Sequence, residues 1–120
     1  MAMHGDHSAE AHARAARTAD AAGVFAEHAE HIVAALPDVP EGHVLVAVVD
    51  DEHAFTGTHH VEQERLVERV PELEGDGGWA MVFTHGVDEA DIRRRTEEMA
   101  TLARRRGEII ERIRAKRASD

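Results

Sequence analysis

The chain has 120 residues, no cysteine and a formal net charge of -10 at neutral pH, and only 3% of its residues are aromatic. Its length predicts one domain, and the lack of cysteine excludes disulfides, a thiolate nucleophile and cysteine-ligated zinc. With so few aromatic residues and so much alanine, the predicted hydrophobic core is small. A fold with such a core is expected to be marginally stable, which favours stabilisation by a partner.

The amino terminus gives the first expectations about location. Residues 1–7 are expected to be disordered. Residues 1–13 hold histidines and acids where a signal peptide has a basic start and an apolar run. No stretch approaches the roughly 18 apolar residues of a membrane span. We therefore expect a cytoplasmic protein with no membrane contact, and the excess of arginine over lysine, with much alanine, is typical of a GC-rich bacterial genome.

An alanine-rich helical pattern begins at Ser8, a good N-cap, and continues to Leu36, after which Pro37 and Pro40 stop it. The second half has an apolar face at helical spacing, and the first half offers mostly alanine. We expect the first half to be exposed, frayed or docked on another chain. The apolar face consists of Val24, Phe25, Ala29, Ile32, Val33 and Leu36.

Three strands are predicted in the middle of the chain. Residues 43–49 form a continuous apolar run, typical of a strand buried on both faces, and residues 54–61 return from a polar turn as an edge strand. Residues 61–70 predict a charged helix that Pro71 ends. Residues 79–85 are again apolar on both faces and predict the central strand of the sheet.

The last helix is predicted to begin near Asp88 and to be basic towards its end. Residues 104–117 hold seven basic groups and two acids, a net of +5, while residues 1–103 hold seven basic groups and 21 acids, a net of -14. Apolar residues recur at a nearly heptad spacing, interrupted by Arg95 and Arg106. The predicted contact surface therefore combines this stripe with the first basic residues: Ile92, Met99, Leu102, Ile109, Ile113, Arg104, Arg105 and Arg106.

These elements predict an α/β fold in the order α-β-β-α-β-α with a small mixed three-stranded sheet. The strand-helix-strand link favours a right-handed crossover with parallel pairing. The first and last helices are expected to cover the two faces of the sheet. The predicted domain covers residues 8–117, with a helical segment 8–36 and a sheet-containing core 43–117, followed by a tail 118–120.

His85 is the main candidate for chemistry. It ends a predicted buried strand, beside Gly86 and a helix start, where an imidazole can bind a metal, act as a base or orient an anion. A structural hydrogen bond is the alternative. Asp91 is a candidate ligand, although Asp88 and Asp91 also have the spacing of a helix cap.

Further histidines offer weaker metal ligands. His28 and His31 stand three residues apart on the first helix and can face the same side, whereas His59 and His60 point to opposite faces of a strand. A structural zinc needs four ligands and a catalytic zinc three. Zinc is therefore only a candidate cofactor, and the sequence does not require one.

The stretch Met81-Val-Phe-Thr-His85, followed by Asp91-Ile-Arg, resembles the JAB-type metallohydrolase fold, in particular its RadC-like branch. The resemblance covers roughly residues 43–110. In that family a strand ends in His-x-His-Pro and a later aspartate completes a zinc site, so the resemblance implies that His85 and Asp91 occupy two of the zinc-ligand positions. The second histidine, the proline and a strand after the last helix are missing here, which implies a relative with a degenerate zinc centre.

The leading functional interpretation is a non-catalytic interaction, regulatory or assembly subunit that self-associates. The first alternative is a zinc-dependent hydrolase in which His85 and Asp91 are joined by His59 or His60. The second is nucleic-acid binding by the basic end of the last helix. Nucleic-acid binding is disfavoured because residues 1–103 are acidic and would repel the phosphates. In addition, no aromatic side chain lies between the basic residues to stack on bases.

Overall fold

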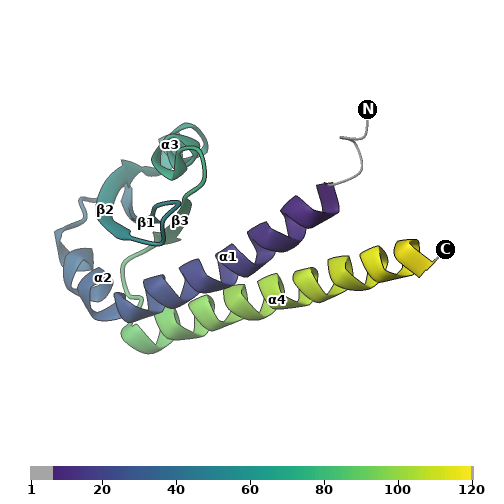
Figure 1. Cartoon of the computed structure of the whole chain (residues 1–120). Coiled ribbons are helices and arrows are strands. Elements are labelled where there is room, and N and C mark those ends of the chain that lie inside the picture. The colour runs from purple at the N-terminus through teal and green to yellow at the C-terminus, as the bar shows by residue number, and fades with distance from the viewer. Residues whose placement is uncertain (1–6, 120) are drawn as a thin grey trace.

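The structure is a computed structural model that describes residues 7–119. Over this range the chain folds in the order α-α-β-β-α-β-α, with two short 3-10 turns (Figure 1). The α/β class is confirmed. The elements are α1 (His7–Glu27), α2 (Ala29–Ala35), η2 (Leu36–Asp38), β1 (His43–Val49), β2 (Phe55–Glu62), η3 (Gln63–Arg65), α3 (Leu66–Glu74), β3 (Trp79–Phe83) and α4 (Glu89–Ser119).

The three strands form one sheet in the order β2-β1-β3, and β1 is antiparallel to both neighbours. The predicted parallel pairing, and with it the mixed sheet, is wrong. The strands β2 and β3 do run in the same direction across the link through α3, but β1 lies between them. The central strand is β1, whose last six residues are all buried, and not the strand that leads to His85. The prediction that the second strand forms an edge is confirmed.

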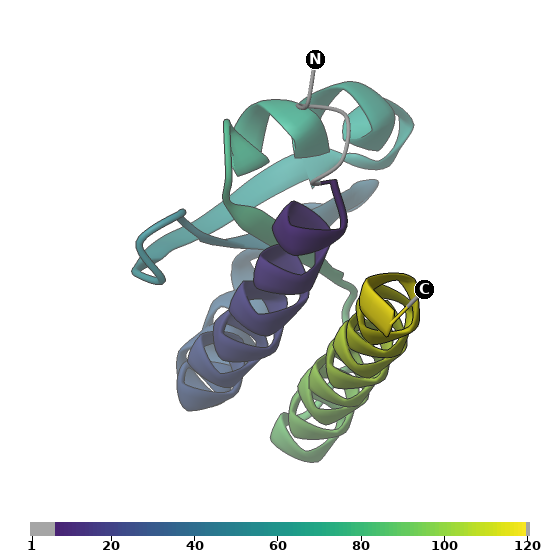
Figure 2. The same ribbon diagram turned by 45° about the vertical axis from the view of Figure 1, so that its right-hand side comes forward.

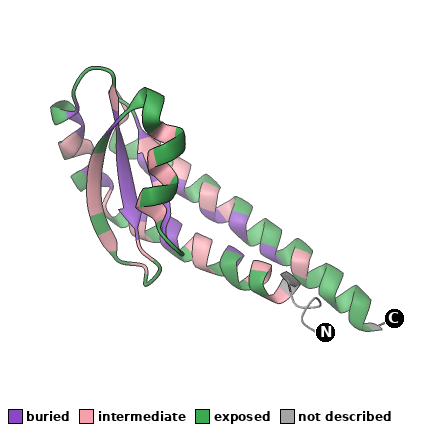
Figure 3. Ribbon diagram, turned by 90° about the horizontal axis from the view of Figure 1, so that it is seen from above, coloured by how far each residue is buried: buried purple, intermediate pink, exposed green. Residues whose placement is uncertain are grey.

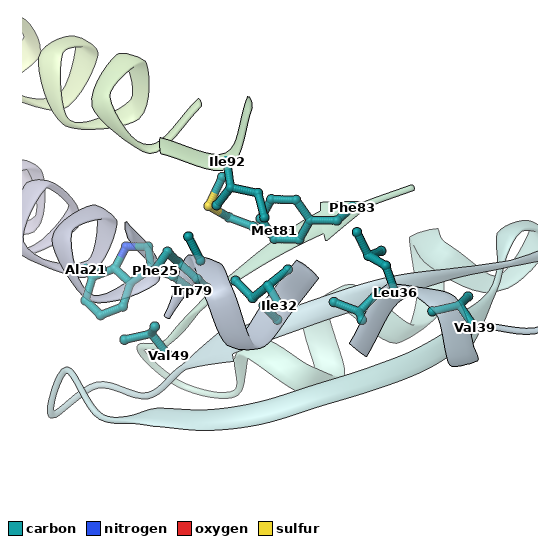
Figure 4. Close-up of a cluster of buried hydrophobic side chains, with 13 residues drawn as sticks. Ala21, Phe25, Ile32, Leu36, Val39, Val49, Trp79, Met81, Phe83 and Ile92 are labelled. Carbon is teal, nitrogen blue, oxygen red and sulfur yellow. The ribbon is translucent and has the colours of Figure 1, made fainter. Parts of the chain in front are cut away.

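The two faces of the sheet have different covers. Leu45, Ala47 and Val49 of β1 belong to the larger apolar cluster, which α1, α2 and the start of α4 share (Figure 4). The alternate residues of β1 belong to a smaller cluster that includes Leu66 and Leu73 of α3. The two long helices therefore lie on the same face, and the expectation that they cover opposite faces is wrong. The charged helix α3 covers the other face because its Leu66 and Leu73 are the apolar side chains that turn inward.

The helices α1 and α4 run side by side in opposite directions and extend past the sheet (Figure 2). This pair makes the molecule elongated, with extents of 56 × 30 × 23 Å. Small residues line the seam: Ala15 of α1 and Ala100, Ala103 and Gly107 of α4 are buried. The first half of the first helix is thus docked on α4 of the same chain, since small side chains let the two backbones approach closely.

Several boundaries differ from the predicted ones. The helical segment 8–36 divides into α1 and α2 at His28. Pro71 lies inside α3 and does not end it. The predicted tail is wrong for Ala118 and Ser119, which are helical, and α1 begins at His7. The rest of the predicted disordered start, residues 1–6, lies outside the described residues.

Candidate interaction surface

His85 lies in the exposed turn between β3 and α4. Its Nε2 is 3.0 Å from the carbonyl oxygen of Val39. Because a carbonyl only accepts, Nε2–H is the donor, and this hydrogen bond ties the turn to the segment that leads into β1. A shallow hollow of about 220 Å³ lies beside it, lined largely by apolar groups such as Val33 and Leu36. This geometry matches the structural alternative considered for His85.

Asp88 and Asp91 cap α4 reciprocally. The backbone N–H of Asp91 donates to Oδ1 of Asp88 at 2.8 Å, and the backbone N–H of Asp88 donates to Oδ2 of Asp91 at 3.1 Å. The hydrogen bond from the Asp88 backbone, followed by that from Arg94, lowers the pKa of the Asp91 carboxyl. Both carboxylates are thus engaged in starting the helix, as a capping box requires.

The histidine pair of the first helical segment contacts an aromatic ring. His28 stacks on Phe55 at a centroid distance of 4.2 Å, and His31 meets the same ring edge-on at 5.6 Å. Nδ1 of His28 also lies 2.9 Å from the carbonyl oxygen of Val24, which leaves that nitrogen as a donor. The two histidines are therefore brought together, as their spacing predicts, but as packing around the start of β2.

His59 and His60 sit at neighbouring positions of β2, opposite Val46 and Leu45 of β1. Since Val46 and Leu45 belong to different apolar clusters, the two imidazoles are on opposite faces of the sheet, as predicted. Among the side chains that the structure describes, those of residues 9–118, no three His, Cys, Asp or Glu are placed to hold a metal ion. The candidate ligands are thus not assembled into one site.

The predicted stripe of α4 divides into a buried and an exposed part. Ile92 is fully buried in the larger cluster, which leaves it no surface for a partner, and Met99 is half-buried against that cluster. Leu102, Ile109 and Ile113 are 64%, 52% and 45% exposed. We call these three residues the α4 stripe. They lie seven and four residues apart and therefore on one face of the helix, away from the small residues that pack on α1.

Arg95 explains one interruption of the heptad pattern. Its guanidinium donates to the carbonyl oxygen of Val82 at 2.7 Å and lies 4.7 Å from the centre of the Phe83 ring. The arginine thus binds the end of β3 and is not part of the outer surface. Further along, Arg104, Arg105 and Arg106 are exposed, as is Arg112, which directly precedes Ile113 at the end of the stripe.

Grooves flank the seam between the two long helices. One of about 400 Å³ is lined by Leu102, Met99 and Arg106 of α4 and by small residues of α1. The other, of about 620 Å³, is lined by residues that include His12, Ala16 and Arg112. Towards their free ends both helices are largely exposed (Figure 3), and Ala15 of α1 and Gly107 of α4 are buried there. The exposed apolar side chains of α4 thus sit on a projecting pair of helices.

One side-chain cluster was missed by sequence reasoning. The Trp79 ring stacks on His53 at 5.3 Å, has the Arg14 guanidinium 4.0 Å from its centre, and donates through Nε1 to the hydroxyl of Thr18 at 3.0 Å. Arg14 also donates to the carbonyl oxygens of Gly77 and Gly78 at 2.8 and 3.1 Å. No spacing in the sequence relates α1 to this loop, and the only hint was the isolated tryptophan.

The same cluster has mixed electrostatics. Partial burial, together with the neighbouring Arg17, lowers the pKa of the Arg14 guanidinium, and Glu74 opposes the shift. A hollow of about 490 Å³ beside it is lined by both arginines and by Glu10, Glu74 and Asp76. Because Arg14 is committed to backbone carbonyls, we read the cluster as the tie between α1 and the loop before β3.

Comparisons of the chain with protein-family models, with curated proteins and with solved structures gave no match. The resemblance to the JAB-type fold therefore stays a prediction that rests on residues 81–85 and 91–93. Within residues 7–119 no helix combines the length and the apolar character needed to cross a bilayer.

Proposed function

We propose that the protein acts by association with protein partners, including a second copy of itself, and that α4 supplies the contact. The observation that carries this proposal is the α4 stripe, whose three large apolar side chains face outward from a projecting helix. The expected role is that of an assembly or regulatory subunit without chemistry of its own.

The energetics support a contact at this place. Complete burial of a Leu or Ile side chain is worth about 1.5–3 kcal/mol relative to exposure, and these three side chains keep about half of their surface in water. The stripe covers 12 residues from Leu102 to Ile113, or about 17 Å of helix at roughly 1.5 Å per residue. A partner helix laid along α4 can cover all three side chains at once.

The charges beside the stripe define the kind of partner. Arg105, Arg106 and Arg112 flank it on the exposed surface. A basic amphipathic helix fits an acidic, partly apolar surface, because opposite charges steer the encounter and fix the register of the contact. The proposal therefore expects an association that weakens as salt concentration rises.

Sedimentation equilibrium of the full chain tests the proposal. We expect the wild type to associate reversibly and the triple variant Leu102→Ser, Ile109→Ser, Ile113→Ser to associate at least tenfold more weakly. The variant Ala115→Ser is the matched control, because it places the same hydroxyl on an exposed position of α4 outside the stripe. Circular dichroism checks that all forms keep their helix content.

Two outcomes contradict the proposal. One is a wild type that stays monomeric at low salt up to about 1 mM, the range in which even a weak contact is populated. The other is a triple variant that associates as strongly as the control. No contact within residues 7–119 favours the zinc-dependent hydrolase or the nucleic-acid reading over this one, and each stays a prediction from the sequence.

A further inference from the structure

A second exposed apolar patch lies on α3. Val67 is 87% exposed, and Pro71, one turn later on the same helix, is also exposed. Glu64, in the η3 turn before the helix, and Glu68 lie on either side of Val67 along the chain and are exposed. Glu74, at the end of α3, instead lines the hollow beside Arg14. We call Val67, Pro71, Glu64 and Glu68 the α3 patch.

The segment that carries the α3 patch is acidic. Residues 62–76 hold six acids and two arginines, a net of -4. The arginines pair with two of these acids, Arg65 with Glu68 at 3.2 Å and Arg69 with Glu72 at 3.2 Å, so the net negative charge comes from the other four acids, Glu62, Glu64, Glu74 and Asp76. The patch thus presents an apolar centre with a negative rim, opposite in charge to the rim of the α4 stripe.

We propose that the second copy binds through its α3 patch, so that the α4 stripe of one copy lies on the α3 patch of the next. This inference rests on the proposed function and names its partner surface. The four exposed large apolar side chains of the described chain then belong to one contact: Val67 on one side, and Leu102, Ile109 and Ile113 on the other.

The two surfaces cannot meet within one copy. α3 packs on one face of the sheet, while α1 and α4 pack on the other, so the sheet lies between them (Figure 1). The contact must therefore be made between molecules. Because the contact joins two different surfaces, a pair keeps a free α3 patch at one end and a free α4 stripe at the other. Further copies can therefore add to it and build open chains or closed rings.

A two-fold contact between two α4 stripes is disfavoured by charge. Such a contact would place Arg105, Arg106 and Arg112 of one copy near the same residues of the other, and residues 104–117 carry a net of +5 in each copy. Like charges opposed across an interface are repulsive. Pairing the stripe with a segment of net -4 removes this repulsion and covers Val67 as well.

The contact is small. About 17 Å of helix on one side and a nine-residue helix on the other form an area at the low end of specific interfaces. We therefore expect a weak and reversible association that depends on salt and on protein concentration.

The pairing of the α4 stripe with the α3 patch can be tested by mixing two variants, each of which lacks one of the two surfaces. Val67→Arg removes the apolar centre of the α3 patch and keeps the α4 stripe. The triple serine variant of Leu102, Ile109 and Ile113 does the reverse. We expect each variant alone to be monomeric where the wild type forms chains, and the equimolar mixture to form a 1:1 complex that does not grow, because only one intact pair of surfaces remains.

A matched control separates surface chemistry from added charge. Ala34→Arg adds the same positive charge at an exposed position of α2, away from both surfaces, and should associate like the wild type. Both substituted positions are exposed, so the fold should be unaffected in both. Circular dichroism and thermal unfolding check this.

Other outcomes overturn the inference in distinguishable ways. If Val67→Arg associates like the wild type while the triple variant does not, α4 binds something other than the α3 patch, and the proposed function survives without this inference. If the wild type stays monomeric, the proposed self-association and the pairing of the α4 stripe with the α3 patch are both wrong. If it stays monomeric and sediments with vesicles of anionic lipid only when the α4 stripe is intact, the stripe binds a membrane surface, and both proposals are replaced.

Discussion

The two ends of the α1–α4 pair are held together in different ways. At the base, beside the sheet, large side chains such as Phe25, Ile32 and Ile92 are fully buried in one apolar cluster. At the tip, the seam consists of small residues such as Ala15 and Gly107. Burial of apolar area is the main stabilising term in folding, so the base must be far more stable than the tip.

The base and the tip of the α1–α4 pair therefore have different roles. The base fixes the direction of α4 relative to the sheet, and the tip carries Ile109 and Ile113 of the α4 stripe away from the core. Segments with few buried apolar contacts open at lower free energy than the core. The tip can therefore adapt to a partner while the base remains folded. Five substitutions sharpen this comparison, and they are taken from the largest expected effect to the smallest.

Phe25→Ala should have the largest effect. The side chain is fully buried among Trp79, Ile32 and their neighbours, and truncation of a buried Phe costs about 3–5 kcal/mol. Since a small domain is stable by about 5–15 kcal/mol, urea denaturation should show a large fall in the midpoint. The control Val67→Ala, at an 87% exposed position, should change stability by less than about 0.5 kcal/mol. Equal effects at the two positions would contradict the view that the apolar cluster at the base holds the fold together.

Gly107→Leu should act at the tip. A Cβ at Gly107 would lie 3.6 Å from the Cβ of Ala15, an ordinary contact, but the further carbons of leucine would reach beyond this distance, towards Ala15 and His12 of α1. We expect a loss of about 1–3 kcal/mol through overpacking, with faster hydrogen exchange confined to the tip. Gly107→Ala is the matched control and should stabilise the helix by up to about 1 kcal/mol. Destabilisation by the alanine would show that the seam is tighter than this contact distance implies.

The sequence was most informative where one physical rule dominated. The run of six buried residues in β1 could only be a strand covered on both faces, and the spacing of Asp88 and Asp91 predicted the cap that the structure contains. The nearly heptad spacing put Leu102, Ile109 and Ile113 on one face of α4, but it did not indicate that Ile92 of the same predicted stripe is buried. The strand, the cap and the shared face depend on neighbours along the chain, so local patterns are sufficient to find them.

The wrong predictions concern contacts between segments that are far apart in the sequence. The link between β2 and β3 predicted parallel pairing, but no local pattern indicates that β1 pairs with both strands. Nor does a local pattern indicate which helices pack on which face of the sheet. Arg95 was read as a break in the stripe, and only the structure brings it to the Val82 carbonyl. The contacts of His85 and Trp79 are also long-range, so their roles could not be read from the sequence.

Asp88→Ala tests the start of α4 at the base. The substitution removes the carboxylate that accepts the Asp91 backbone N–H, and the loss of an N-cap typically costs about 1 kcal/mol. Thermal unfolding should therefore show a smaller shift than Phe25→Ala. Asp88→Asn is the control, because its amide oxygen can still accept this hydrogen bond and should preserve most of the stability.

The same cap predicts a dependence on acid. Because the pKa of Asp91 is lowered in the folded chain, its contribution is present above the ordinary pKa of a carboxyl and is lost as pH falls through the lowered value. Asp91→Asn should flatten this part of the stability-pH curve. A wild type and an Asp91→Asn variant with parallel curves between about pH 5 and pH 2 would contradict the prediction.

Glu111→Ala should have the smallest effect, at the tip. His12 lies between two acceptors: its Nδ1 is 3.1 Å from the Gly107 carbonyl oxygen, and its Nε2 is 3.3 Å from the Glu111 carboxylate. A contact between two exposed polar side chains is worth at most about 1 kcal/mol, so global unfolding should barely change, while amides of α1 near His12 should exchange somewhat faster. Glu108→Ala removes the same charge from the exposed surface of α4 and is the control. A loss at Glu111 as large as that at Phe25 would mean that the tip is held by this polar contact as firmly as the base is held by its core.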